Sequence, residues 1–359
     1  MGCGAVIGGG INDRFGWRWA FLVLAPISTL ASIGVGVFLP RSTSSNTSLR
    51  KQLGRIDYGG SITLVSSLAL LLIYLNHDDS QMATSGLATK AFIVLSAVFF
   101  ALFVVIELRW SREPIIPLTL FRNPTVLAAC LCSLLMAMTI YTLMFYVPLY
   151  LQLRGYSTSQ TGVRLLPESV GGGLGSFVVG FVTRRTGKYS ALKIILPILI
   201  VLGTAGFAVI TIDASSVLPE FYLFFNGFGF GGLLTVLLLA LLSAVPHSQQ
   251  ATSTSALLAF RSIGSTVGLS VAGVVFRSRL NGQAPMNATQ HGHPQSHQLQ
   301  VGDGSDRTAD VYMSALHGTF LLALGLAIPG FICAIFVKNY SLRSAVNDDE
   351  VTVSNNDGE

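Results

Sequence analysis

Charged residues are scarce in this chain of 359 residues. Only 11% are Asp, Glu, Lys or Arg, whereas an ordinary soluble domain carries about 25%. Apolar residues make up 51% of the chain, and the mean hydropathy is +0.62. This composition excludes an ordinary soluble domain and predicts an integral membrane protein that has the lipid bilayer as its first partner.

Cysteine and histidine are also rare, with 4 and 6 residues. The cysteines all fall in apolar runs, where they are expected to be small buried side chains: Cys3, Cys130, Cys132 and Cys333. His291, His293 and His297 lie in a polar segment without Cys or carboxylates at fixed spacing, so a solvated loop is favoured over a metal tract. We predict neither a metal site nor a cofactor.

Signals for nucleic-acid or nucleotide partners are missing. The net charge of +5 comes from basic residues between apolar runs, which indicates membrane topology rather than nucleic-acid binding. No phosphate-binding P-loop is present, and the dinucleotide-like GFGFGG at 227–232 lies inside an apolar run rather than at a strand-to-helix turn. The runs also lack a His–Asp or multi-His constellation, so we do not expect an enzyme.

Nine apolar runs have the length of about 20 residues that crosses the hydrocarbon of a bilayer. They are 17–38, 56–76, 91–108, 126–150, 162–183, 194–212, 221–244, 256–276 and 313–337. Barrel strands would be about 10 residues long and would alternate strictly. The predicted fold class is therefore an all-α polytopic membrane protein with about nine transmembrane helices.

The basic residues predict the orientation. Alternate connections hold 13 Lys or Arg residues in one set and 8 in the other, with one more inside a run. The richer set is assigned to the cytoplasm, together with the C-terminus. It includes a basic clamp after the run 162–183, formed by Arg184, Arg185 and Lys188.

The polar segments follow from this orientation. Residues 281–310 are predicted to be a flexible non-cytoplasmic loop, and 339–359 a disordered cytoplasmic tail. Asn287-Ala-Thr is then the glycosylation acceptor on the side where glycosylation takes place, whereas Asn46 and Asn339 match the motif but face the cytosol.

The stretch 141–188 is predicted to be a helical hairpin in lipid. An apolar run ends at Tyr150, a turn rich in hydroxyls follows, and a second run opens with Pro167 and Glu168. Glycines gather in that second run: Gly171, Gly172, Gly173 and Gly175. Such a cluster indicates a bendable element that lines a cavity.

Small residues four apart recur in other runs and let helix backbones approach closely. Packing alone is the simpler interpretation of any one pair. The pairs are Gly4 and Gly8, Gly171 and Gly175, Gly227 and Gly231, and Gly264 and Gly268.

Ionisable residues inside the runs are the strongest functional candidates, because a charge at mid-bilayer costs at least ~2.5–3.5 kcal/mol. Arg261 either serves the solute path or snorkels to the interface. For Glu168 we favour a structural role, as a first-turn acid paired with Arg164 four residues earlier, over a role in the path. Asn226 and Tyr141 are polar groups that a solute cavity would use, although lone residues of this kind more often serve packing.

Four blocks resemble the major facilitator superfamily, and specifically its fungal fourteen-span drug:proton antiporter branch, which includes vacuolar basic amino acid transporters. The blocks are GINDRFGWRWAF at 10–21, IDYGGS at 56–61, EPIIPLTLFRN at 113–123 and FYVPLYLQLRGYSTSQTGVRLLP at 145–167. Residues 4–9, with Gly9 at their end, look like the end of the antiporter motif of helix five, with Ala5 where Pro is usual. Residues 180–189 look like a counterpart of the cytoplasmic loop motif, with Thr183 replacing its acid.

The resemblance implies a domain plan in which the first half is incomplete and its coupling carboxylates are missing. The expected parts are the end of helix five and helix six (1–39), a cytoplasmic loop (40–55), two linker helices with their connection (56–124), a complete six-helix second half (125–338) and the tail (339–359). The start MGCGAVIGGG agrees with a helix whose beginning is absent.

The resemblance further implies a secondary transporter that is driven by the proton gradient. The expected solutes are basic amino acids or drugs, and the expected location is the vacuolar or plasma membrane. The alternative is a non-transporting half or a partner subunit of a membrane complex.

Overall fold

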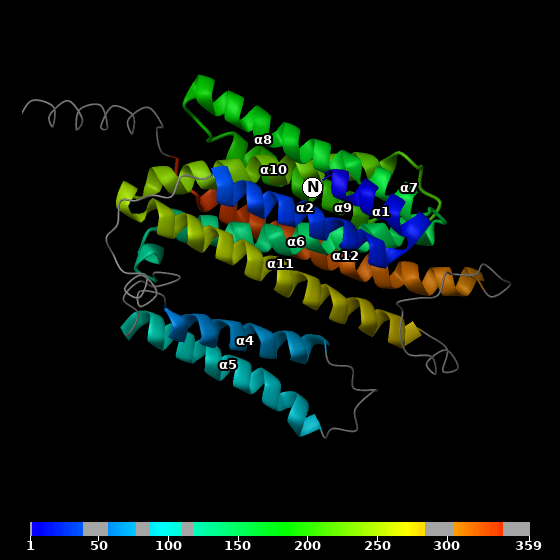
Figure 1. Ribbon diagram of the computed structural model, residues 1–359, viewed down its shortest axis with the longest axis horizontal. Coiled ribbons are helices and arrows are strands. Elements are labelled where there is room, and N and C mark those ends of the chain that lie inside the picture. Colours follow the sequence, from blue (N-terminus) through cyan, green and yellow to red (C-terminus); the bar gives the residue numbers. More distant parts are fainter. Residues whose placement is uncertain (1, 39–56, 77–85, 110–117, 284–304, 340–359) are drawn as a thin grey trace, which may run out of the picture.

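Every regular element of the described residues is a helix (Figure 1). The computed structural model describes residues 2–38, 57–76, 86–109, 118–283 and 305–339. The acceptor site Asn287 and the whole of the predicted loop 40–55 lie outside these ranges. The elements are α1 (Gly2–Phe15), α2 (Trp17–Phe38), α4 (Tyr58–Asn76), α5 (Gly86–Arg109), the short 3-10 helix η1 (Leu118–Arg122), α6 (Pro124–Leu153), α7 (Thr158–Arg164), α8 (Leu166–Thr186), α9 (Leu192–Ala208), α10 (Leu218–Ala244), α11 (His247–Gln283) and α12 (Ser305–Phe336).

The predicted all-helical membrane fold is confirmed. Eight helical segments are long and apolar enough to cross a membrane, and α9 is a shorter apolar helix of 17 residues. Each of the nine predicted runs coincides with one of these segments, and α7 and α8 together form the fifth. The chain is thus a multi-pass integral membrane protein.

Two helices are longer than the apolar runs predicted. α11 extends to Gln283, and α12 already begins at Ser305. The prediction of a flexible loop over 281–310 is therefore wrong at both of its ends, while residues 284–304 lie outside the description. The sequence SDRTAD at 305–310 opens with Ser and Asp, which favour the start of a helix although they are not apolar.

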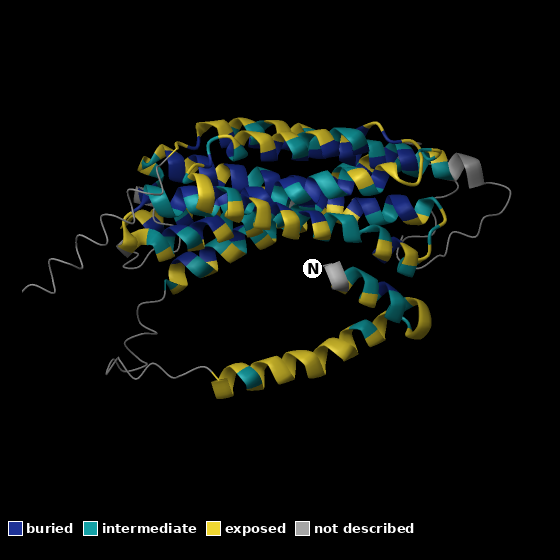
Figure 2. Ribbon diagram, turned by 90° about the horizontal axis from the view of Figure 1, so that it is seen from above, coloured by how far each residue is buried: buried dark blue, intermediate teal, exposed yellow. Residues whose placement is uncertain are grey.

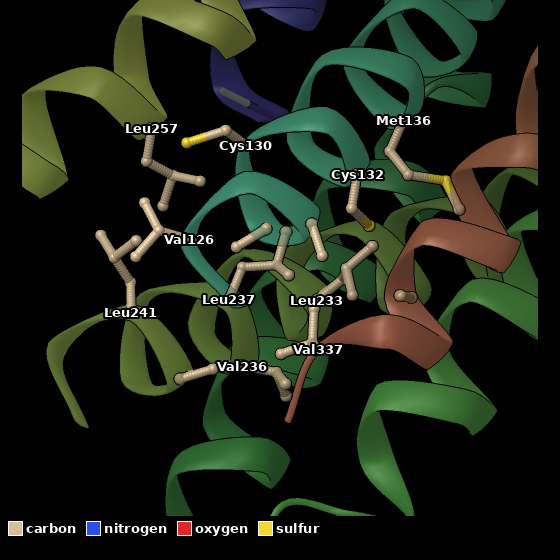
Figure 3. Close-up of a cluster of buried hydrophobic side chains, with 14 of the residues drawn as sticks. Val126, Cys130, Cys132, Met136, Leu233, Val236, Leu237, Leu241, Leu257 and Val337 are labelled. Atoms are coloured by element: carbon tan, nitrogen blue, oxygen red, sulfur yellow. The ribbon is translucent and has the colours of Figure 1, made fainter. Parts of the chain in front are cut away.

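Six spans form one bundle around α6. This helix packs against α10, α11 and α12, while α8 and α9 flank α10. Figure 3 shows the inner part of the core, where Cys130, Cys132 and Met136 of α6 meet Leu233 and its neighbours on α10. Cys130 and Cys132 are fully buried, as their apolar surroundings predict.

A second apolar cluster fills the other half of the bundle. Leu143 and Tyr146 of α6, Phe207 of α9 and Phe320 of α12 are buried there. Phe207 lies 5.6 Å from Phe320 between ring centroids. The two clusters leave α6 buried over most of its length, which makes it the central helix of the bundle.

Helices α4 and α5 form a separate pair beside α11 (Figure 1). The hydroxyl of Ser67 donates to the carbonyl of Ser96 at 3.0 Å, and Ser96 donates back to the carbonyl of Ser67 at 2.8 Å. The guanidinium of Arg277 on α11 donates to the carbonyl of Leu75 at 2.7 Å. Side-chain hydrogen bonds therefore join the pair internally and tie it to the bundle.

Of the two N-terminal helices, α1 contacts the bundle and α2 makes few contacts with it. α1 packs on α7 and α8, whereas α2 packs mainly on α1 and has no buried residue. In Figure 2, where the chain begins at the label N, α2 is exposed almost throughout and stands apart from the bundle. The contact of α1 with α7 is thus the main attachment of this part of the chain.

Candidate functional site

The closest helix crossing in the bundle is lined by the α8 glycines that the sequence singled out. A Cβ atom at Gly171 would overlap the carbonyl oxygen of Phe224 on α10. One at Gly175 would overlap the carbonyl oxygen of Phe228. The two backbones therefore touch, and no larger residue fits at either position unless the helices separate.

The α10 side of the crossing is built in the same way. A Cβ atom at Gly227 would overlap the carbonyl oxygen of Glu168, and one at Gly231 would overlap that of Gly172. The hydroxyl of Ser176 donates to the carbonyl of Gly231 at 2.8 Å across the contact. Both glycine pairs thus belong to a single interface, and one side-chain hydrogen bond crosses it.

The remaining glycines divide into packed and open positions. Gly264 and Gly268 of α11 face the backbone of α6 at Leu134 and Met138. A Cβ at Gly172 would make an ordinary contact at 3.6 Å, and Gly173 has no neighbour within 4 Å. Gly4 and Gly8 face open space among the described residues, so the close packing expected of that pair is absent there, and Gly9 makes the contact of α1 instead.

Glu168 lies in the first turn of α8, at the end of this crossing, and is half-buried. The sequence interpretation paired it with Arg164, and the structure corrects this. The Arg164 guanidinium bonds Glu220 of α10 at 2.5 Å and lies 4.0 Å from the centre of the Tyr156 ring. No described residue gives the Glu168 carboxyl a hydrogen bond or a cation.

Asn226 serves packing rather than an open path. It is fully buried between α9 and α10, where its amide donates to the Tyr222 carbonyl at 3.0 Å and accepts from the Thr204 hydroxyl at 3.1 Å. A Cβ at Gly203 would collide with its side chain. Its polar groups are satisfied within the protein, so the expectation that Asn226 contacts solute does not fit its position.

Arg261 and Tyr141 are half-buried on α11 and α6. The described residues give neither side chain a hydrogen bond or an ion pair. α6 and α10 lie between α11 and α8, so Arg261 and Glu168 do not form one site (Figure 1). The candidates from the sequence are therefore distributed over the bundle, and Glu168 alone adjoins the glycine-lined crossing.

The basic clamp occupies the end of α8 opposite to Glu168. Arg184, Arg185 and Lys188 are exposed, and Gly187 ends the helix with a φ of +66° in the left-handed region that favours glycine. Arg185 lies over the Phe181 ring at 4.5 Å. The clamp residues themselves bridge no helices in the described structure.

Lys193 performs a bridging role that the sequence analysis missed. It is buried at the start of α9, and its ammonium group donates to the carbonyls of Val337 and, at 3.4 Å, of Ile335 at the end of α12. Tyr189 supports the same contact by donating to the carbonyl of Lys338 at 3.1 Å. A cation at a helix C-terminus satisfies free carbonyls and the helix dipole. The sequence places Lys193 next to a loop, and nothing in its spacing reveals the partner helix.

Comparison with known proteins gives the family. The model of the Major Facilitator Superfamily matches residues 1–269. The efflux pump FUS6 of Gibberella fujikuroi is 26% identical over 96% of this chain and 65% of that protein. The vacuolar basic amino acid transporter 2 of Saccharomyces cerevisiae is 32% identical over 76% of this chain and 60% of that protein.

The multidrug resistance protein fnx1 of Schizosaccharomyces pombe is 28% identical over 96% of this chain and 68% of that protein. The chain thus spans about two thirds of the length of the curated relatives it matches. By name these relatives are a pump, a transporter and a resistance protein, which agrees with the prediction that the chain is not an enzyme.

Among solved structures, a bacterial homolog of the human lysosomal transporter Spinster matches with a TM-score of 0.50. The identity is 15%, and the match covers 80% of this chain and 64% of the other. This likeness shows the fold alone. Together with the helical bundle and the family match over three quarters of the sequence, it leads to one conclusion: the chain belongs to the Major Facilitator Superfamily.

Proposed function

We propose that this protein takes part in secondary transport of small organic solutes, that the transport is coupled to the proton gradient, and that basic amino acids or drugs are the solutes. Membership of the superfamily supports membrane transport. The names of two relatives, one a basic amino acid transporter and one a multidrug resistance protein, suggest the solute classes. The vacuolar and plasma membranes are the two candidate locations.

The observation that carries the proposal is the position of Glu168. It is half-buried in a spanning helix and has no cation among the described residues, because Arg164 is engaged by Glu220. A charge in a membrane span is costly, and acids that persist there typically belong to proton relays or ion paths. We therefore assign proton binding during transport to Glu168.

The adjoining helix crossing would couple proton binding at Glu168 to a movement of α8 against α10. The backbone of Glu168 touches Gly227, so a shift of the first turn of α8 is transmitted directly to α10. Glycine-lined crossings allow helices to slide, because no side chains interlock at the contact. Rocking of helices around a central site is how transporters of this architecture expose the site to alternate sides.

The experiment compares Glu168→Gln with the matched variant Glu220→Gln in membrane vesicles. Both acids lie in the first turn of a helix, but Glu220 is paired with Arg164. With an imposed proton gradient and labelled lysine, arginine or a cationic drug, we expect Glu168→Gln to lose gradient-driven uptake at normal membrane levels. Glu220→Gln should retain most uptake, because a half-exposed ion pair contributes only about 0–1 kcal/mol.

Equal uptake by the two variants would remove Glu168 from the mechanism. Absence of uptake by the unaltered protein would instead favour the alternative, a non-transporting partner in a membrane complex.

A further inference from the structure

Helices α1 and α7 touch backbone to backbone at the end of the bundle opposite to the basic clamp (Figure 1). A Cβ atom at Gly9 would lie 2.7 Å from the carbonyl oxygen of Thr158. One at Gly162 would overlap the carbonyl oxygen of Ala5. Gly9 is the one fully buried residue within 4–15, so little apolar surface holds this contact together.

A carboxylate fastens the contact. Asp13 accepts a hydrogen bond from the backbone N–H of Ser159 at 2.8 Å, although the two residues are 146 positions apart. Asn12 donates to the hydroxyl of Thr158 at 3.5 Å. Asp13 therefore contacts α7 at its first turn, where backbone N–H groups lack partners within the helix.

The capping of α7 explains why this amide is available. Ser157 accepts from the N–H of Gln160 at 3.3 Å, and the Gln160 side chain accepts from the N–H of Ser157 at 3.1 Å. This reciprocal box satisfies two amides and leaves the N–H of Ser159. Asp13 supplies the acceptor from another part of the chain.

The hydrogen bonds from Ser159 lower the pKa of Asp13 below its ordinary value of 3.8. A lowered pKa means that the contact is favoured above this value and is lost only as the pH falls through the lowered pKa. The groups from α7 that surround Asp13 are hydroxyls and amides, and Arg14 and Arg18 are the nearest cations along the chain. The carboxylate is therefore charged at neutral and mildly acidic pH.

We propose that Asp13 is the latch of a gate formed by α1 and α7, which must part when solute enters or leaves at this end of the protein. The gate rests on the proposed transport function. α1 is the main attachment of the N-terminal helices, and it meets α7 through two glycines and a few hydrogen bonds. Such a contact separates and re-forms without disturbing an apolar core.

The test uses disulfide cross-linking of Asn12→Cys with Thr158→Cys, whose native side chains approach to 3.5 Å. The background carries Cys3→Ala. With a mild oxidant at neutral pH, we expect rapid cross-linking when Asp13 is present and a several-fold lower rate with Asp13→Ala. The matched control is Asp213→Ala, an exposed acid between α9 and α10, which should leave the rate unchanged.

A second variant distinguishes a latch from a general structural defect. Ser159→Pro removes the donor N–H within the first turn of α7, where the amide has no partner inside the helix. It should lower the cross-linking rate as Asp13→Ala does, and the double variant should lower it no further, because both changes break one interaction. Additive losses, or an unchanged rate in Asp13→Ala, would overturn the latch.

Transport is then measured on the cross-linked protein. We expect the disulfide to stop uptake and a reductant to restore it, whereas undiminished uptake with the disulfide intact would refute the gate. The cross-linking rate does not depend on transport, so a protein that moves no solute would contradict the proposed function and not the role of Asp13 in holding α1 to α7.

Discussion

At the scale of single residues, the position of Arg164 determines which of two neighbouring acids, Glu168 or Glu220, is held in an ion pair. Arg164 ends α7, and α8 starts only at Leu166. The interruption at Leu165 means that Arg164 and Glu168 do not share one continuous helix, so their four-residue spacing brings no ion pair. Arg164 bonds Glu220 instead, and Glu168 has no cation among the described residues.

Asn226→Ala tests the structural role assigned to this residue. The substitution removes the Asn226 acceptor of the Thr204 hydroxyl, which keeps the Ile200 carbonyl at 2.7 Å, and empties the space beside Gly203. The loss of one buried hydrogen bond typically costs about 0.5–1.5 kcal/mol. We expect a lower unfolding temperature in detergent with uptake that is retained at a permissive temperature. Unchanged unfolding together with lost uptake would return Asn226 to the solute path.

Arg261→Ala tests another of the candidates from the sequence. A half-buried guanidinium without a described partner is costly to keep in a span, so we expect it to serve transport. Uptake should fall more strongly than the amount of protein in the membrane, as measured by surface labelling. Normal uptake by a well-delivered variant would reduce Arg261 to a side chain that snorkels.

At the scale of helices, the contact of α8 with α10 sets which substitutions the bundle accepts. Gly175→Leu places a side chain against the backbone of α10, whereas Gly173→Leu enters open space. We expect Gly175→Leu to destabilise the bundle by about 1–3 kcal/mol or more and to block uptake. Gly173→Leu is the matched control and should unfold like the native protein in a thermal scan. The reverse order would mean that α8 packs through its other face.

Much of the helical arrangement follows from the sequence, for identifiable reasons. Long apolar runs predict the spans, and the glycines at 171, 175, 227 and 231 predict the tightest helix crossing. Both features can be recognised from residues that are close together in the sequence. The break at Leu165 and the reach of Lys193 to the end of α12 depend on helices that are distant in sequence. Asp13 was visible only as part of a family motif, because its partner lies 146 residues away.

At the scale of the whole molecule, the two ends of the bundle carry different groups. The clamp Arg184, Arg185 and Lys188 lies at one end, where Tyr189 also bonds the carbonyl of Lys338, next to Asn339. α11 ends at the opposite side (Figure 1), and Asn287 follows it in sequence beyond the described residues. The predicted topology therefore separates the two acceptor sites across the membrane.

Glycosylation tests this orientation. In a eukaryotic host we expect a glycosidase-sensitive mobility shift that disappears with Asn287→Gln and persists with Asn46→Gln or Asn339→Gln, because acceptors are modified on the non-cytoplasmic side. A shift that depends on Asn46 or Asn339 would reverse the topology.

The central position of α6 has a consequence for biosynthesis. The hydroxyl of Thr139 is fully buried and donates to the carbonyl of Ala323 on α12, which lies 184 residues later. At about 5–20 residues per second, that acceptor leaves the ribosome roughly 10–40 s after Thr139. During this interval the carbonyl of Leu135, 3.1 Å away on the same helix, already accepts from the hydroxyl. The hydroxyl of Thr139 thus has an acceptor within α6 while this helix lies in lipid, before α12 is inserted and supplies the second acceptor.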